Sequence, residues 1–334
     1  MHVERPIACP IGMQINFPRL PIGVGLDEVA LIVDVEAVLS YVVFQIRDET
    51  LKIDHCHQLQ PAMFSRGSVA RARVGGIGAG LWFTAAVDDV VLLSVLHEAV
   101  DAIVVALRDH DDWGLSGGRD GQYVSDLVAD KAVLTVFKRH GIQVLSEESG
   151  LVGEGDGSLI AVVDPLDGST NASRPLPWFA TSLCVVDDAG ARAAVVHDHP
   201  AGVRYDALRG GGARLDGALL PCREPVELAD AIVGVNGLPP RNPGWAQYRA
   251  LGAAALDLCA VADGRLDAYV DYDHEAHGGW DYLGGMLVCQ EVGVTVGDAF
   301  GRALVTTEHA ARRTPVAAVG ALFDDLIAAR RDIS

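Results

Sequence analysis

Long helical patterns alternate with short apolar runs from residue 87 onward, and this alternation constrains the fold more than any other feature. Apolar residues recur at helical spacing in 87–110 and in 124–140, and Gly141 then ends the second pattern. The apolar runs that follow are typical of strands: SLIAVV, ATSLCVV, ARAAVV, VRYDAL, AIVGV and TPVAAV. Helices at both ends with strands between them indicate an α/β (α+β layered) fold around a mixed sheet.

The first 84 residues differ in texture from the rest. Five prolines interrupt any long element there, and only 29–48 is strongly periodic, as a helix or as strands. Residues 1–86 hold 7 basic and 8 acidic residues, whereas the remainder holds 19 and 37. We therefore expect residues 1–84 to be an N-terminal extension of uncertain structure, disordered or derived from a mis-assigned start, and 85–334 to be an enzyme domain.

The overall charge excludes several classes of partner. The chain carries 45 acidic and 26 basic residues, a formal net charge of −19 at pH 7, so we expect no nucleic acid and no membrane as partner. No apolar run reaches the roughly 18 to 20 residues that span a membrane. Six cysteines without a C-x-x-C pair indicate free thiols in a reducing, cytoplasmic setting. An anionic substrate would then need bound metal ions that reverse the local charge.

Three acidic clusters stand out: SEES at 146–149, DPLDGST at 164–170 and GGWD at 278–281. Asp164 ends an apolar run and Asp167 follows three residues later, so a tight turn would aim both carboxylates at one point. Two such carboxylates repel each other unless a cation separates them, and hard oxygen ligands suit Mg²⁺. Gly168, Ser169 and Thr170 then offer backbone N–H groups to a phosphate if a helix starts there. Taken alone, each cluster also fits a capped turn, a solvated loop or a helix N-cap.

In this order, the clusters resemble the signature of the inositol monophosphatase family of Mg²⁺-dependent, lithium-sensitive phosphatases: G-E-E-[ST], D-P-[LI]-D-G-[ST] and W-D. The glycine-rich stretch 209–217 and the stretch 248–269 are similar to further family segments. The resemblance covers about residues 87–334 and leaves the extension unmatched. It implies an alternating αβαβα sandwich of the sugar-phosphatase type and a homodimer.

The resemblance also implies a set of metal ligands. Glu147, Asp164 and the backbone carbonyl of Leu166 would hold a first Mg²⁺. Asp164, Asp167 and Asp281 would hold a second. The expected cofactor is therefore two Mg²⁺ ions, and a third depends on the residues of the helical pattern 124–140.

Further roles follow from the same resemblance. Backbone N–H groups of Gly168 and Ser169 would bind the phosphate, while Glu147 and the Ser169 hydroxyl would position the attacking water. Asp130 would support the Ser169 hydroxyl and a third metal. Hydroxyls of the substrate would contact two residues: Ala254 and Asp271.

Two segments depart from the family pattern. In the stretch V-T-x-x-D-x-x-x-E, Asp130 takes the aspartate position, but Leu127 and Leu134 stand where threonine and glutamate are usual, which leaves the third metal open. The loop 271–279 is longer than expected, and it brings three more polar side chains near the substrate pocket: His274, Glu275 and His277. The substrate specificity therefore stays open.

The sequence thus predicts a Mg²⁺-dependent phosphomonoesterase for a small polyol or sugar phosphate, with myo-inositol 1-phosphate as the default substrate. Fructose 1,6-bisphosphate and histidinol phosphate are alternatives with the same chemistry. A regulatory or binding protein on the same fold is an alternative of another class.

Overall fold

The computed structural model describes residues 26–33, 40–46, 49–53, 71–72, 84–155 and 157–332. The chain divides into two compact units, Met1–Val87 and Asp88–Ser334. The strands of the first unit form an antiparallel sheet in the order β3-β2-β1-β4. Their bounds are β1 (Leu26–Val33), β2 (Ser40–Ile46), β3 (Glu49–Ile53) and β4 (Arg71–Ala72). The periodic segment 29–48 therefore contains strands and no helix among its described residues.

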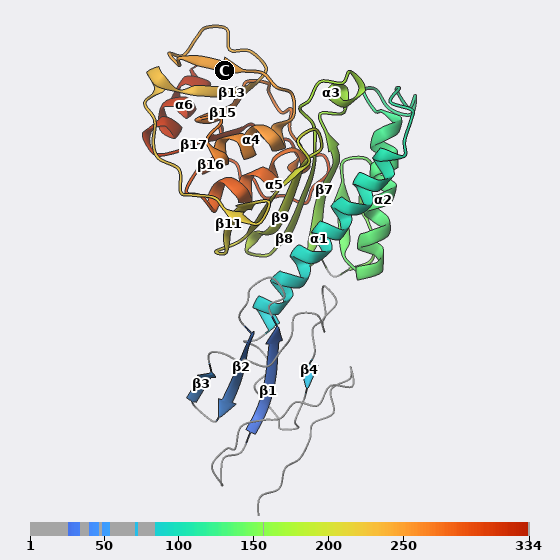
Figure 1. Ribbon diagram of the computed structural model, residues 1–334. Coiled ribbons are helices and arrows are strands. Elements are labelled where there is room, and N and C mark those ends of the chain that lie inside the picture. The colour runs from blue at the N-terminus through green and yellow to red at the C-terminus, as the bar shows by residue number, and fades with distance from the viewer. Residues whose placement is uncertain are drawn as a thin grey trace, which may run out of the picture. The chain divides into compact units, whose positions relative to one another are not determined.

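The second unit consists of five layers, which confirms the expected αβαβα sandwich (Figure 1). Its helices are α1 (Thr84–Arg108), α2 (Val124–His140), α3 (Ser169–Ser173), α4 (Ala254–Asp263), α5 (Gly279–Gln290) and α6 (Ala321–Arg331). Helices α1 and α2 cover one face of a large sheet, and α4 and α5 lie between that sheet and a smaller one. Helix α6 covers the outer face of the smaller sheet.

The large sheet has the order β12-β11-β10-β9-β8-β7-β5-β6. Its bounds are β5 (Gln143–Ser146), β6 (Gly150–Val152), β7 (Ile160–Asp167), β8 (Ala180–Asp187), β9 (Gly190–Asp198), β10 (Val203–Leu208), β11 (Gly212–Leu215) and β12 (Ala218–Leu219). Strands β7 to β11 pair antiparallel in chain order, while β5 pairs parallel with β7. Helices on both faces explain why the central strands are almost continuously apolar.

The smaller sheet has the order β14-β13-β15-β17-β16. Its bounds are β13 (Ile232–Asn236), β14 (Gln247–Arg249), β15 (Ala268–Asp271), β16 (Thr295–Asp298) and β17 (Pro315–Ala318). Strand β15 is buried along its whole length and pairs parallel with β13 and antiparallel with β17. It ends at Asp271, and the loop that follows leads into α5.

Helix α1 owes its place to a stripe of apolar side chains. Leu96, Val100 and Ile103 are fully buried and pack with Ala161 and Val163 of β7 in one core cluster. Burying a side chain of this kind contributes roughly 1.5–3 kcal/mol. The sequence analysis expected no apolar run long enough to span a membrane. By length and composition, however, Asp89–Arg108 is such a segment, with a mean hydropathy of 2.2. The core helix of a soluble protein can meet the same criterion.

Candidate metal centre

Three aspartates from two elements meet at the carboxyl end of β7. Asp164 and Asp167 lie in that strand, and Asp281 lies in the first turn of α5. One carboxylate oxygen from each residue lies within 4.8 Å of the others. Asp164 is 1% exposed and Asp167 is 8% exposed, so the cluster is largely shielded from bulk water. The structure therefore brings together three of the predicted ligands.

An irregularity in the pairing of β7 with β8 turns both strand carboxylates to the same point. Asp164 pairs with Ser182 and Asp167 pairs with Ala180, and the register shifts between them. Thr181 donates a hydrogen bond to the carbonyl of Pro165 within this step, at 2.9 Å. Because a bulge reverses the alternation of side chains, residues that a regular strand would place on opposite faces share one face here.

Backbone N–H groups hold each carboxylate in place and leave other oxygens free for a ligand. Leu166 N donates to Asp164 Oδ1 at 3.0 Å, and Ala255 N donates to Asp167 Oδ2 at 2.7 Å. Asp281 Oδ2 accepts from Gly278 N at 2.6 Å, which closes the first turn of α5. Ala255 lies in the first turn of α4, so a candidate metal ligand also caps that helix.

The electrostatics of the cluster call for a cation. Burial raises the pKa of Asp164 well above its ordinary value, and the charges of Glu147, Asp167 and Asp281 raise it further. The pKa of Asp167 is raised well above its ordinary value too, by burial and by the charge of Asp281. Oxygen ligands of this kind and number suit a hard divalent ion, which removes their mutual repulsion. The residues present therefore fit a magnesium site.

The two glutamates of the SEES motif have different surroundings. The buried Glu148 carboxylate binds Arg119 at 2.8 Å and also accepts from Gln122. Glu147 lies outside the trio of aspartates, yet its charge reaches Asp164 and Asp281. Burial and the charge of Asp281 raise the pKa of Glu147 to about 8. Arg119 Nη2 lies 3.7 Å from Glu147 Oε1, farther than from Glu148, and a role of Glu147 as a metal ligand stays a prediction.

Gly168 sits where a side chain would not fit. Its φ of 81° lies in the left-handed region, and a Cβ would come within 3.1 Å of the Ala253 side chain and of the carbonyls of Gly252 and Trp178. Ser169 follows as the first residue of α3. The glycine therefore lets the chain turn sharply between the metal ligands and the serine.

Asp126 is a site residue that the sequence analysis did not select. It lies in the first turn of α2, and the Ser169 hydroxyl lowers its pKa. Burial outweighs that effect and raises the pKa of Asp126 to about 6. Its Oδ2 accepts from Tyr123 N at 2.8 Å, whereas its buried Oδ1 has no hydrogen-bond partner among the described residues. The sequence signal that could have identified Asp126 is its spacing, because it is a carboxylate one helical turn before Asp130.

Asp130, predicted to support Ser169, has other partners. Its Oδ1 accepts from the Ser146 hydroxyl at 2.5 Å, and its Oδ2 accepts from the Ser149 hydroxyl. Asp130 therefore ties α2 to the SEES motif. The carboxylate beside Ser169 belongs to Asp126, four residues earlier on the same helix face.

The predicted substrate residues lie next to the cluster. Ala254 begins α4 beside Ala255, whose N–H binds Asp167, and Leu166 is buried between the strand ligands. Asp271 is fully covered: its Oδ1 accepts from Asn236 Nδ2 at 3.0 Å and from Asp273 N at 2.9 Å. Burial raises the pKa of Asp271 to about 6. Contact between Asp271 and a substrate stays a prediction.

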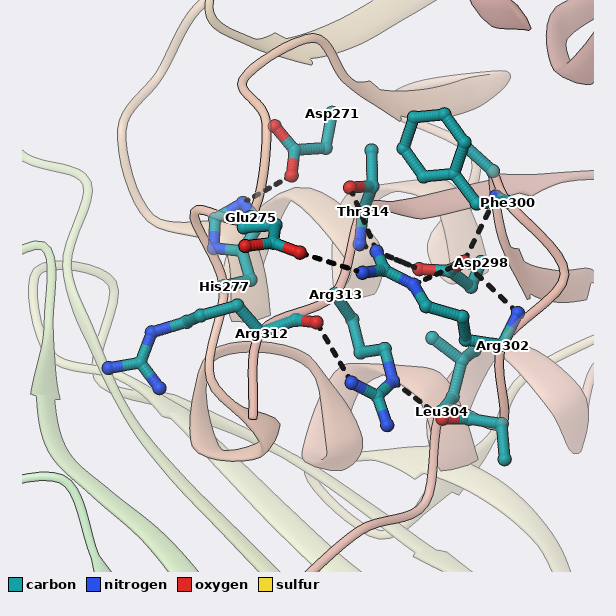
Figure 2. Close-up of polar contacts among 12 residues, drawn as sticks. Asp271, Glu275, His277, Asp298, Phe300, Arg302, Leu304, Arg312, Arg313 and Thr314 are labelled. Atoms are coloured by element: carbon teal, nitrogen blue, oxygen red, sulfur yellow. Dashed lines mark hydrogen bonds and ion pairs between the residues drawn. The ribbon is translucent and has the colours of Figure 1, made fainter. Parts of the chain in front are cut away.

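Another buried aspartate, Asp298, has positively charged and N–H neighbours instead of carboxylates (Figure 2). Asp298, at the end of β16, accepts from Arg302 Nε at 3.0 Å and from Arg302 Nη2 at 2.8 Å. It also accepts backbone N–H groups of Phe300 and Thr314. Burial alone would raise the pKa of Asp298, but these donors lower it below the ordinary value.

The layers and the carboxylate cluster define the class of protein, an αβαβα sandwich of the sugar-phosphatase type. The family described as "Inositol monophosphatase family" matches residues 119–334. Inositol-1-monophosphatase from Mesorhizobium japonicum is 32% identical over 200 residues, which cover 54% of this chain and 74% of the relative. Nus factor SuhB from Pasteurella multocida is 27% identical over 245 residues, which cover 67% of this chain and 90% of the relative.

A solved structure supports the same assignment of the fold. Inositol monophosphatase from Anabaena aligns with a TM-score of 0.61 at 24% identity, and the alignment covers 73% of this chain and 96% of that one. The chain belongs to the inositol monophosphatase family.

Proposed function

We propose that this protein is a Mg²⁺-dependent phosphomonoesterase that hydrolyses a small polyol or sugar phosphate, with myo-inositol 1-phosphate as the first substrate to test. The observation that carries the proposal is the convergence of Asp164, Asp167 and Asp281 within 4.8 Å in a largely buried site. Membership of a phosphatase family agrees with this reading.

The three aspartates that the structure brings together support the ligand set that the family resemblance implies. Asp164, Asp167 and Asp281 would share the ions, with Glu147 and the Leu166 carbonyl completing the set. When bound, Mg²⁺ supplies an activated water and stabilises the charge on the leaving oxygen. A third ion would be held by Asp126, because its Oδ1 is buried and unpartnered among the described residues, whereas both oxygens of Asp130 bind serines.

The remaining groups act on the water and the phosphate. The Ser169 hydroxyl, with Asp126 beside it, would orient the attacking water and pass a proton to the carboxylate. The N–H groups of Gly168 and Ser169 would bind the phosphate, and Ala254 and Asp271 would line the alcohol end. Fructose 1,6-bisphosphate and histidinol phosphate are alternative substrates. A cytoplasmic homodimer inhibited by lithium completes the proposal.

The decisive experiment is phosphate release from a panel of polyol and sugar phosphates, with Mg²⁺, with EDTA and with added lithium. We expect Mg²⁺-dependent turnover that EDTA and lithium both block. Asp188→Asn is the matched control for a ligand substitution such as Asp164→Asn. Asp188 is an exposed aspartate on the β8–β9 turn, and we expect the Asp188→Asn protein to be fully active. Turnover that survives EDTA would contradict the proposed chemistry.

A regulatory or binding role on the same fold is the second candidate, and the relatives named Nus factor SuhB favour keeping it. The same panel separates the two. Mg²⁺ binding without turnover of any phosphate ester would support the second candidate and remove the first.

A further inference from the structure

His277, in the loop between β15 and α5, lies between Asp271 and Asp281, and Figure 2 shows its contact with Asp271. His277 Nε2 lies 3.8 Å from Asp271 Oδ2, and His277 Nδ1 lies 3.6 Å from Asp281 Oδ2. His277 Nε2 is also within 2.9 Å of the Tyr269 hydroxyl. The imidazole side chain is only 12% exposed. One ring therefore faces a predicted metal ligand and the carboxylate at the end of β15.

Contacts with the segment between β16 and β17 hold this loop in place. The ring of His274 lies 5.7 Å from the ring of Phe300, and Glu275 Oε1 lies 3.3 Å from Arg302 Nη1. Arg313 N donates to the carbonyl of His277 at 2.8 Å. These contacts fix the loop at three successive points, the last of them at His277 itself.

The backbone at Glu275 shows that this loop shape carries a cost. Its φ of 56° lies in the left-handed region, which non-glycine residues rarely adopt. A conformation of this kind persists only where the surroundings determine it, and it often accompanies functional sites. Here the ion pair of Glu275 with Arg302 and the ring contact of His274 hold the backbone of Glu275 in this conformation.

An unpaired oxygen lies where the histidine points. Asp271 Oδ2 is buried and has no hydrogen-bond partner among the described residues, while Asp271 Oδ1 has two donors. A buried carboxylate oxygen without a donor is unfavourable, so a nearby N–H group has a defined use there. His277 Nε2 lies within ion-pair distance of this oxygen.

We propose that His277 is a positioning residue that holds Asp281 in the orientation needed by the metal site and links it to Asp271 at the alcohol end. The inference rests on the proposed function, because it takes Asp281 as a metal ligand. His277 would lie behind a carboxylate that binds the metal. Substitution of a side chain in such a position typically costs about 10- to 100-fold in metal affinity or activity.

Two amide substitutions separate the two ends of the imidazole. Asparagine places its N–H₂ near the position of Nδ1, which faces Asp281, and glutamine places its N–H₂ near the position of Nε2, which faces Asp271. Leucine removes both donors while it keeps the apolar volume. His274→Leu measures the contribution of loop packing, because it is the same change in the same loop and removes the ring contact with Phe300.

The experiment is calorimetric titration of Mg²⁺ into each full-length variant without substrate, followed by KM for inositol 1-phosphate. We expect His277→Leu to weaken Mg²⁺ binding about tenfold, and His277→Asn to recover most of that loss. We expect His277→Gln to bind Mg²⁺ weakly but to recover KM. His274→Leu should lose less Mg²⁺ affinity than His277→Leu.

Several outcomes would overturn the inference. Equal losses in His277→Leu and His274→Leu would show that the loop acts through packing alone. Normal Mg²⁺ affinity in His277→Leu would remove the positioning role while it leaves the metal site intact. If His277→Leu fails to fold, His277→Asn and His277→Gln provide the test. Equal Mg²⁺ affinities in those two variants would contradict the inference. A parent chain that binds no Mg²⁺ would refute the proposed function, and this inference with it.

Discussion

A cluster of aspartates around Asp164 and the single buried aspartate Asp298 have opposite electrostatics. Asp164 is 1% exposed and has a raised pKa, whereas Asp298 is 4% exposed and has a lowered one. Both side chains are shielded from solvent, so solvent exposure alone does not explain the difference. The neighbours do, because Asp298 has the Arg302 guanidinium and Asp164 has other carboxylates.

This difference separates a structural carboxylate from a functional one. Arg302 and backbone donors satisfy Asp298 within the fold itself. The group around Asp164 is left with excess negative charge, which an external cation has to balance. The uncompensated cluster is therefore the candidate for the functional site, whereas Asp298 holds the loop that follows it through Phe300 and Arg302.

Replacing a ligand in the uncompensated group should have the largest effect. Asp164→Asn removes a carboxylate that both proposed ions would share, and we expect turnover to fall by about 10³-fold, equivalent to about 4 kcal/mol of transition-state stabilisation. Phosphate release at saturating Mg²⁺ measures this loss. Activity within tenfold of the parent would show that the cluster is not the catalytic centre.

The uncompensated group should also make stability depend on pH and on Mg²⁺. The folded pKa of Glu147 is about 8, and those of Asp164 and Asp167 are raised too, so the metal-free folded chain binds more protons than the unfolded chain. Its stability should therefore fall as the pH rises from about 4 to about 8. Mg²⁺ at 100 times its dissociation constant should add about 2.7 kcal/mol. Thermal unfolding at pH 6 and pH 8.5, with and without Mg²⁺, tests both statements. Equal stability at the two pH values in EDTA would argue against a charged, metal-free cluster.

The compensated group should respond to the same chemical change with the opposite sign. Asp298→Asn leaves Arg302 without its charged acceptor, and we expect the free energy of unfolding to fall by about 2 kcal/mol. In the metal-free chain, Asp164→Asn should instead raise it, because it removes repulsion. Urea denaturation in EDTA compares the two. A change of the same sign in the free energy of unfolding of both variants would contradict the proposed difference between Asp164 and Asp298.

The smallest effect concerns Asp257, a buried aspartate whose pKa is raised by burial and lowered by a hydrogen-bond donor. Burial raises the pKa of Asp257 to about 7, and the Trp178 indole opposes this by donating from Nε1 at 3.0 Å. Trp178→Phe removes the donor and keeps most of the ring, so we expect a loss of about 1 kcal/mol in the free energy of unfolding at pH 8. The loss should shrink at pH 5, where Asp257 is protonated. A pH-independent loss would point to packing instead.

Much of this arrangement follows from local patterns in the sequence. The helical spacing in 124–140 and the stop at Gly141 are confirmed, since Gly141 caps α2 with a φ of 65°. The apolar run before Asp164 is the fully buried strand β7. Local patterns of this kind depend on side-chain periodicity and on glycine conformation, both of which a single sequence displays.

Other features depend on contacts between distant segments. The sequence analysis placed Asp130 beside Ser169, but Asp126 lies there, and the two residues share one face of α2. Periodicity alone cannot choose between residues one turn apart, because the choice depends on how α2 packs against β7. No local pattern indicates a role for Asp298 or Arg302. Their pairing depends on how the loop after β16 folds back on the end of that strand.

The position of Asp281 has a consequence for synthesis of the chain. Asp164 and Asp167 emerge from the ribosome long before α5, the helix that carries the third aspartate of the cluster. A nascent chain that ends after β9 therefore holds two mutually repelling carboxylates without their partner. If Mg²⁺ binds as proposed, it would stabilise the fold fully only after the last quarter of the protein has been made.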